Sequence, residues 1–136
     1  GKLQLAVWDF NNGFDNYQWF RTETDALYTV ENSWFERLWQ DKTFRKCVCE
    51  RYRQLRKTTL SDEYIYDKIA SYQEELGEAV DRNFKVWGYS FDETLLAGTT
   101  KEGTSRDIGS YEEAVKQLTD TIRERLAYLD KELGGN

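Results

Sequence analysis

The 136-residue sequence contains no histidine, no methionine and no proline. Histidine is the most common general base and metal ligand, so without it any chemistry must come from carboxylates, lysine, tyrosine, cysteine or a bound ion. The absence of methionine, and so of a start residue, leads us to expect a piece of a longer polypeptide. The absence of proline fits a chain dominated by long helices, because proline breaks helix interiors.

Other absences exclude whole classes of protein. The sequence has no apolar run of about 18 residues, so we expect no membrane span, and we identify no signal peptide. The formal net charge of −6 argues against non-specific nucleic-acid binding, which needs a basic surface. The only two cysteines, Cys47 and Cys49, would point in opposite directions on a helix. They therefore predict neither a disulfide nor a zinc site.

Hydrophobic side chains are nevertheless plentiful, at 39% of residues, and aromatic ones reach 15%. This composition predicts a folded and tightly packed object, and residues 1–136 suit one domain. We expect Trp8, Trp19 and Trp34 to lie in the core. Carbohydrate binding through these tryptophans is the alternative.

The first part of the chain, residues 1–32, differs from the rest. Residues 3–8 alternate and then become apolar, which predicts a short strand. Residues 9–16 are rich in Asp, Asn and Gly and predict a loop. Residues 17–32 are aromatic with weak periodicity, so their structure stays open.

Helical patterns dominate residues 33–87 and return at 110–134, on either side of a Gly-, Thr- and Ser-rich loop at 88–109. One apolar stripe continues from Ile65 to Trp87, which predicts a single long helix with Gly77 inside it. The expected N-terminal capping residues are Ser33, Asp41, Ser61 and Ser110. The predicted fold is mainly α: a short strand and an aromatic loop followed by a bundle of three to four helices.

Only residues 7–16, where the predicted strand passes into the loop, look like a site. Asp9 follows the end of the predicted strand, and carboxylates in such turns can bind hard cations. The spacing does not match a calcium-binding EF-hand loop, because Gly13 and Phe20 stand where a ligand is needed. From composition alone, Asp9 and Asn11 indicate an ordinary turn more strongly than a metal site.

The order of several short elements resembles the CotH-like (spore coat protein H-like) atypical protein kinases. Residues 7–11 read Val-Trp-Asp-Phe-Asn and are similar to the family's "WDFD" element. The elements at 34–44, 60–65, 82–87 and 110–130 are similar to its "WFxRLLxDPxF", "LSxEYID", "RNFxRW" and closing "RLxWLD" elements. The resemblance covers nearly the whole chain and implies a helical C-terminal part of a kinase-like domain.

This resemblance implies a function and a site. The family transfers a phosphoryl group from ATP to Ser or Thr, and the Asp of its "WDFD" element holds the magnesium ion on the ATP phosphates. That residue is Asp9 here, and Asn11, where the family has a second Asp, completes the implied Mg²⁺–ATP-binding pair. The family's catalytic base lies upstream of this element, so we expect no catalytic residue in this chain and no activity from it alone.

The resemblance also implies a protein substrate in the spore coat or at the cell surface, and a location outside the cytoplasm. Asn11 removes one negative charge from the element, which fits a pseudokinase. The alternative from another class is a non-catalytic helical protein-interaction module, favoured by the acidic surface and the many aromatic residues.

Overall fold

The computed structural model describes residues 14, 23–28, 33–87 and 110–135. The described helices are α1 (Ser33–Trp39), α2 (Lys42–Arg56), α3 (Asp62–Leu76), α4 (Ala79–Trp87) and α6 (Tyr111–Leu133). Within these ranges the chain contains no strand, and the strand expected at 3–8 lies outside them. The prediction of a mainly α chain is therefore confirmed, with five described helices instead of three to four.

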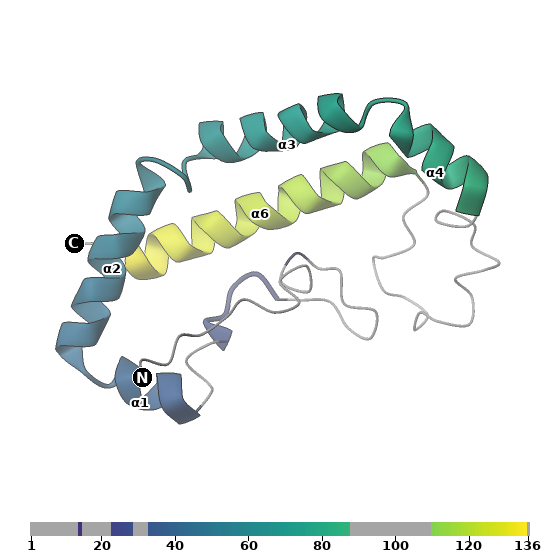
Figure 1. The fold of residues 1–136 in the computed structure, drawn as a ribbon. Coiled ribbons are helices and arrows are strands. Elements are labelled where there is room, and N and C mark those ends of the chain that lie inside the picture. The colour runs from purple at the N-terminus through teal and green to yellow at the C-terminus, as the bar shows by residue number, and fades with distance from the viewer. Residues whose placement is uncertain (1–13, 15–22, 29–32, 88–109, 136) are drawn as a thin grey trace, which may run out of the picture.

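The helices form an arch with one helix inside it (Figure 1). α2, α3 and α4 follow one another around the arch, and α6 runs back along its inner side, antiparallel to α3. The C-terminal end of α6 meets α2, while α1 lies at the foot of the arch before α2. No helix among the described residues is both long enough and apolar enough to cross a membrane.

Three of the expected capping residues begin helices as the sequence predicts. The Asp41 carboxylate accepts hydrogen bonds from two backbone N–H groups of α2, at 2.6 and 3.0 Å, and these bonds lower the pKa of Asp41. The hydroxyls of Ser61 and Ser110 each accept one such bond, at 3.2 and 3.1 Å. Local sequence predicts these contacts correctly because they depend only on residues within one turn.

Gly77 divides the long helix that the apolar stripe predicts. α3 ends at Leu76 and α4 begins at Ala79, so the prediction of a single helix is wrong. Gly77 has φ 43° and ψ −130°, a backbone conformation that side chains with a Cβ rarely adopt, and its N–H donates to the Gln73 carbonyl. A helical spacing of apolar residues can continue across such a break, because spacing alone does not register a change in backbone direction.

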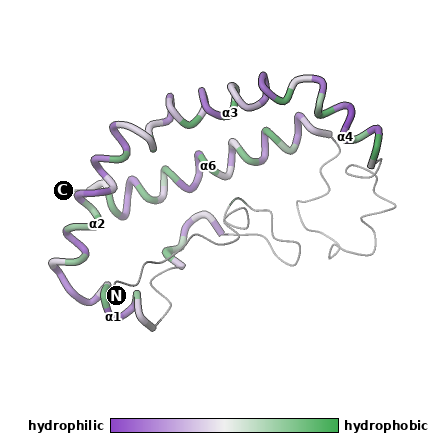
Figure 2. The backbone as a smooth tube through the Cα atoms, viewed as in Figure 1, coloured by the Kyte–Doolittle hydropathy of each residue, from purple (hydrophilic) through white to green (hydrophobic). Residues whose placement is uncertain are grey.

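The hydrophobic core of the described residues is small and lies where α2 meets α6. Its buried side chains are Tyr52, Leu126 and Leu133, with Thr121 beside them. Figure 2 shows apolar and polar residues alternating along α3 and α6. An apolar groove of about 320 Å³, however, separates the second half of α3 from the start of α6. Tight packing is therefore not found along this part of α3.

Exposed apolar side chains follow from this open arrangement. Trp34 is 81% exposed, so the expectation that it lies in the core is wrong. Its helix, α1, is only 7 residues long and joins the arch through α2, which leaves one side of α1 toward solvent. Trp8 and Trp19 lie outside the described residues.

Candidate functional site

The predicted metal-binding residues, Asp9 and Asn11, both lie outside the described residues. The nearest described residues after them in the sequence are Phe14 and residues 23–28, and both parts lie against α6. Among the described residues, no group of three or more Cys, Asp or Glu side chains could hold a metal ion.

Arg125 of α6 bonds the backbone of residues 24–26. Its Nη1 donates to the carbonyl oxygen of Thr24 at 3.0 Å and also to the carbonyl oxygen of Ala26. At the preceding position of the helix, the Glu124 carboxylate accepts a hydrogen bond of 3.3 Å from the Thr24 hydroxyl. Two neighbouring side chains of α6 therefore bind the same short segment. Arg125 binds its backbone, and Glu124 binds the Thr24 side chain.

A small apolar cavity of about 250 Å³ lies next to this contact. Phe14 forms one side of it, Leu60 and Ile65 contribute from the junction of α2 and α3, and Ile122, Arg125, Leu126 and Thr121 line it from α6. Leu60 and Ile65 stand at the two positions of a hydrophobic staple around the start of α3. The cavity thus joins the N-terminal segment, the α2–α3 junction and α6.

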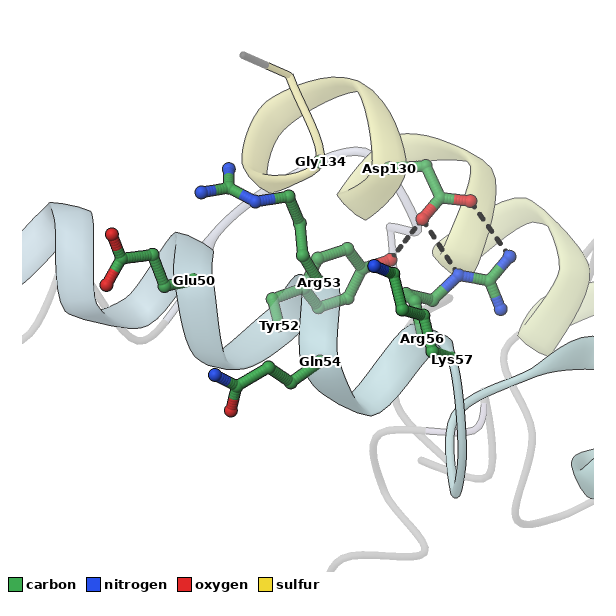
Figure 3. A pocket seen from close by; sticks show the side chains of 8 residues that line it. All are labelled: Glu50, Tyr52, Arg53, Gln54, Arg56, Lys57, Asp130 and Gly134. Atoms are coloured by element: carbon green, nitrogen blue, oxygen red, sulfur yellow. Dashed lines mark hydrogen bonds and ion pairs between the residues drawn. The ribbon is translucent and has the colours of Figure 1, made fainter.

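The strongest polar cluster joins α2 to α6 (Figure 3). Arg56 forms a two-point ion pair with Asp130, with Nε 2.9 Å from Oδ1 and Nη2 3.0 Å from Oδ2. Tyr52, one turn earlier on α2, donates its hydroxyl proton to Asp130 Oδ1 at 2.7 Å. The remaining Nη1 of Arg56 donates to Asp62 at 2.8 Å and to the Leu60 carbonyl, so one guanidinium joins α2, α3 and α6.

The ionisation of this cluster is set by its own contacts. Burial alone would raise the pKa of Asp130, but the hydrogen bonds from Arg56 and Tyr52 outweigh burial and lower that pKa below its ordinary value. Burial, and then the bond to Asp130, raises the pKa of Tyr52. The Asp130 carboxylate also raises the pKa of Arg56. At neutral pH Arg56 and Asp130 are therefore both charged, and the Tyr52 hydroxyl keeps its proton.

This cluster is suited to holding helices together. A cavity of about 510 Å³ beside it is lined by both acidic and basic residues: Glu50, Tyr52, Arg53, Gln54, Arg56, Lys57, Asp130 and Gly134. Both carboxylate oxygens of Asp130 already accept hydrogen bonds, and its lowered pKa makes it a weak base. We therefore assign the cluster a structural role.

Sequence reasoning missed Arg56, Asp130 and Arg125 as contact residues. The sequence marks Arg56 only as one of several cations near the end of a helix, where it does lie. The available signal was that Tyr52 and Arg56 are four positions apart, and so lie on one face of a helix. Nothing local could name Asp130 as their partner, 74 positions beyond Arg56.

Other ion pairs of the described residues join positions three or four apart in the sequence. Arg82 and Glu78 are 3.5 Å apart, and Arg123 and Asp120 are 2.7 Å apart. Their spacing predicts that both pairs lie on solvated helix faces, and such pairs contribute little. Cys47 and Cys49 are free thiols, as expected.

Comparison with known proteins places the chain in a family. The family model described as "CotH kinase protein" matches residues 1–129, which include Asp9, Asn11 and the described helices up to Leu129. No curated protein and no solved structure matches the sequence. Since the match covers nearly the whole chain, the chain belongs to the CotH kinase family.

Proposed function

We propose that this chain is the helical C-terminal part of a CotH-type kinase domain that transfers a phosphoryl group from Mg²⁺–ATP to Ser or Thr. The observation that carries the proposal is the family match over residues 1–129, which includes the Trp-Asp-Phe-Asn element. The protein acceptor would belong to the spore coat or the cell surface, outside the cytoplasm. The catalytic base would come from residues upstream of this chain, so these 136 residues alone would be inactive.

The donor chemistry of Asp9 and Asn11 fits magnesium. Mg²⁺ prefers oxygen ligands and is commonly held in ATP sites by one or two carboxylates together with phosphate oxygens. Asp9 supplies the carboxylate and Asn11 a neutral amide oxygen, so this pair carries one negative charge instead of two. Bound there, the metal ion would neutralise charge on the phosphates during transfer. In this proposal Asp9 holds the ion and Asn11 supports it.

An assay of phosphoryl transfer tests this function. The complete polypeptide would be incubated with labelled ATP, Mg²⁺ and a coat or surface protein extract. Wild type is expected to label Ser or Thr residues, and Asp9→Ala is expected to lose the labelling. Asp67→Ala removes an exposed carboxylate of α3, away from residues 24–26; it is the matched control and should keep the labelling. Equal labelling by wild type and Asp9→Ala would show that Asp9 does not hold the ion.

A second candidate function is a non-catalytic interaction module, or a pseudokinase that binds a protein partner without transfer. The apolar groove between α3 and α6 favours it, because Tyr72 and Leu76 on its wall are 57% and 49% exposed. Exposed apolar surface of this kind is typical of protein-binding sites. This candidate becomes the leading one if the complete polypeptide binds no nucleotide.

A further inference from the structure

Arg125 connects two segments that are far apart in the sequence. Its Nη1 bonds the carbonyl oxygens of Thr24 and Ala26, which lie 101 and 99 positions earlier. A hydrogen bond from a charged donor is about twice as strong as one between neutral groups. One guanidinium nitrogen therefore fixes two carbonyl groups of a segment that forms no α-helix of its own.

The head group of Arg125 is itself held in place by α6. The guanidinium carbon lies 5.5 Å from the centre of the Tyr128 ring, about one turn further along the helix, in a cation–π contact. Glu124 adds an independent contact to the Thr24 hydroxyl. Arg125 is only partly exposed, so the surrounding protein also restricts its position. These contacts give the arginine a defined geometry toward residues 24–26.

A cavity connects Phe14 with the same arginine. Both residues line the 250 Å³ cavity, together with Leu60, Ile65 and Leu126. Phe14 is five positions after Asp9 in the sequence. Five extended residues span at most roughly 17 Å. A restraint on Phe14 therefore limits the distance between Asp9 and α6.

We propose that Arg125 is a positioning residue, which holds residues 24–26 against α6, beside the cavity at Phe14, and so restricts Asp9 and Asn11 for binding Mg²⁺–ATP. The proposal rests on the function proposed above. Arg125 acts through the carbonyls of Thr24 and Ala26 and the cavity at Phe14, and it need not touch the nucleotide.

Hydrogen exchange on the complete polypeptide tests the anchoring step. In Arg125→Ala, amides within residues 14–28 are expected to exchange about tenfold faster than in wild type, because a charge-assisted bond has been lost. Arg125→Lys keeps a cationic donor and should recover part of the protection. Lys116→Ala, which removes a cation paired with Asp120 of its own helix, is the matched control and should behave as wild type. Unchanged exchange at 14–28 in Arg125→Ala would overturn the proposal.

The affinity for ATP, measured across a series of magnesium concentrations, tests the positioning step. Arg125→Ala is expected to bind Mg²⁺–ATP about five- to tenfold more weakly, while Arg125→Lys recovers in part and Lys116→Ala binds normally. Should Arg125→Ala fail to fold, Thr24→Val removes only the hydroxyl contact to Glu124 and should show a smaller change in the same direction.

The two measurements separate the two proposals. Wild-type affinity in Arg125→Ala would contradict the positioning role even if exchange is faster. If wild type binds no ATP, the proposed function is wrong and the positioning role is wrong with it. Faster exchange in Arg125→Ala would then show a structural anchor alone.

Discussion

Arg56 on α2 and Asp130 on α6 form a two-point ion pair, with N–O distances of 2.9 and 3.0 Å. This pair joins α2, at the start of the arch, to the C-terminal end of α6, which runs along the inner side of the arch (Figure 1). The buried side chains Tyr52, Leu126 and Leu133 lie on the same two helices. The buried side chains of the described core and the hydrogen bonds of Tyr52, Arg56 and Asp130 therefore lie at the same junction between α2 and α6.

Replacing Arg56 by Lys tests the geometry of this pair. Lysine keeps the positive charge but cannot form two parallel bonds to one carboxylate. Because Asp130 is 43% exposed, solvent weakens the pair, and we expect a loss of about 1 kcal/mol in the free energy of unfolding of the complete polypeptide. Urea denaturation would measure it. Arg45→Lys, at an exposed position of the same helix, should leave the unfolding midpoint unchanged.

Tyr52→Phe removes one hydroxyl from the core and leaves the ring. Tyr52 is only 6% exposed, and its hydroxyl donates to Asp130 at 2.7 Å. We expect a loss of about 1 kcal/mol, because the carboxylate keeps Arg56 but loses a buried donor. Tyr64→Phe, at a 44% exposed position, should be nearly neutral. Equal effects of the two substitutions in a thermal melt would contradict a structural role for the Tyr52 hydroxyl.

The pH dependence of stability follows from Asp130. Its pKa is lowered in the folded chain, so the unfolded chain binds a proton more readily. The resulting stabilisation is fully present above the unfolded pKa of about 4, and is lost as the pH falls through the lower folded pKa. Between neutral pH and about pH 3, wild type should therefore lose more unfolding free energy than Asp130→Asn. Equal losses of unfolding free energy in wild type and Asp130→Asn would show that the ionisation of Asp130 does not cause the pH dependence.

Gly77→Ala tests the break between α3 and α4. At φ 43° and ψ −130° a Cβ is strained whatever space surrounds it, so we expect a loss of about 1–3 kcal/mol. Gly135→Ala is the matched control, because its added Cβ would meet only ordinary contact, at 3.8 Å. A more stable Gly77→Ala protein would instead support the continuous helix that the apolar stripe suggests.

The parts of this fold that depend on near neighbours are predictable from the sequence. Asp41, Ser61 and Ser110 cap their helices because the bonds involved stay within one turn. The same local reasoning fails at Gly77, since periodicity shows which side of a helix is apolar and not where the backbone turns. The contacts of Arg56 and Arg125 could not be predicted, because their partners lie 74 and about 100 positions away.

The candidate site was predicted from a different kind of information. Composition predicts only a turn at Asp9 and Asn11. Their roles come from the resemblance to CotH-like kinases, whose short sequence elements occur here in the same order. The family match over residues 1–129 confirms the family. The roles of Asp9 and Asn11 stay predictions, because the described residues begin at Phe14.

Binding of ATP to the complete polypeptide, measured by calorimetry with and without magnesium, tests the central claim most directly. We predict magnesium-dependent binding in wild type that is lost in Asp9→Ala and kept in Asp67→Ala. A folded wild type that binds no nucleotide, or an Asp9→Ala protein that binds as well as wild type, would contradict the role of Asp9 in holding Mg²⁺–ATP.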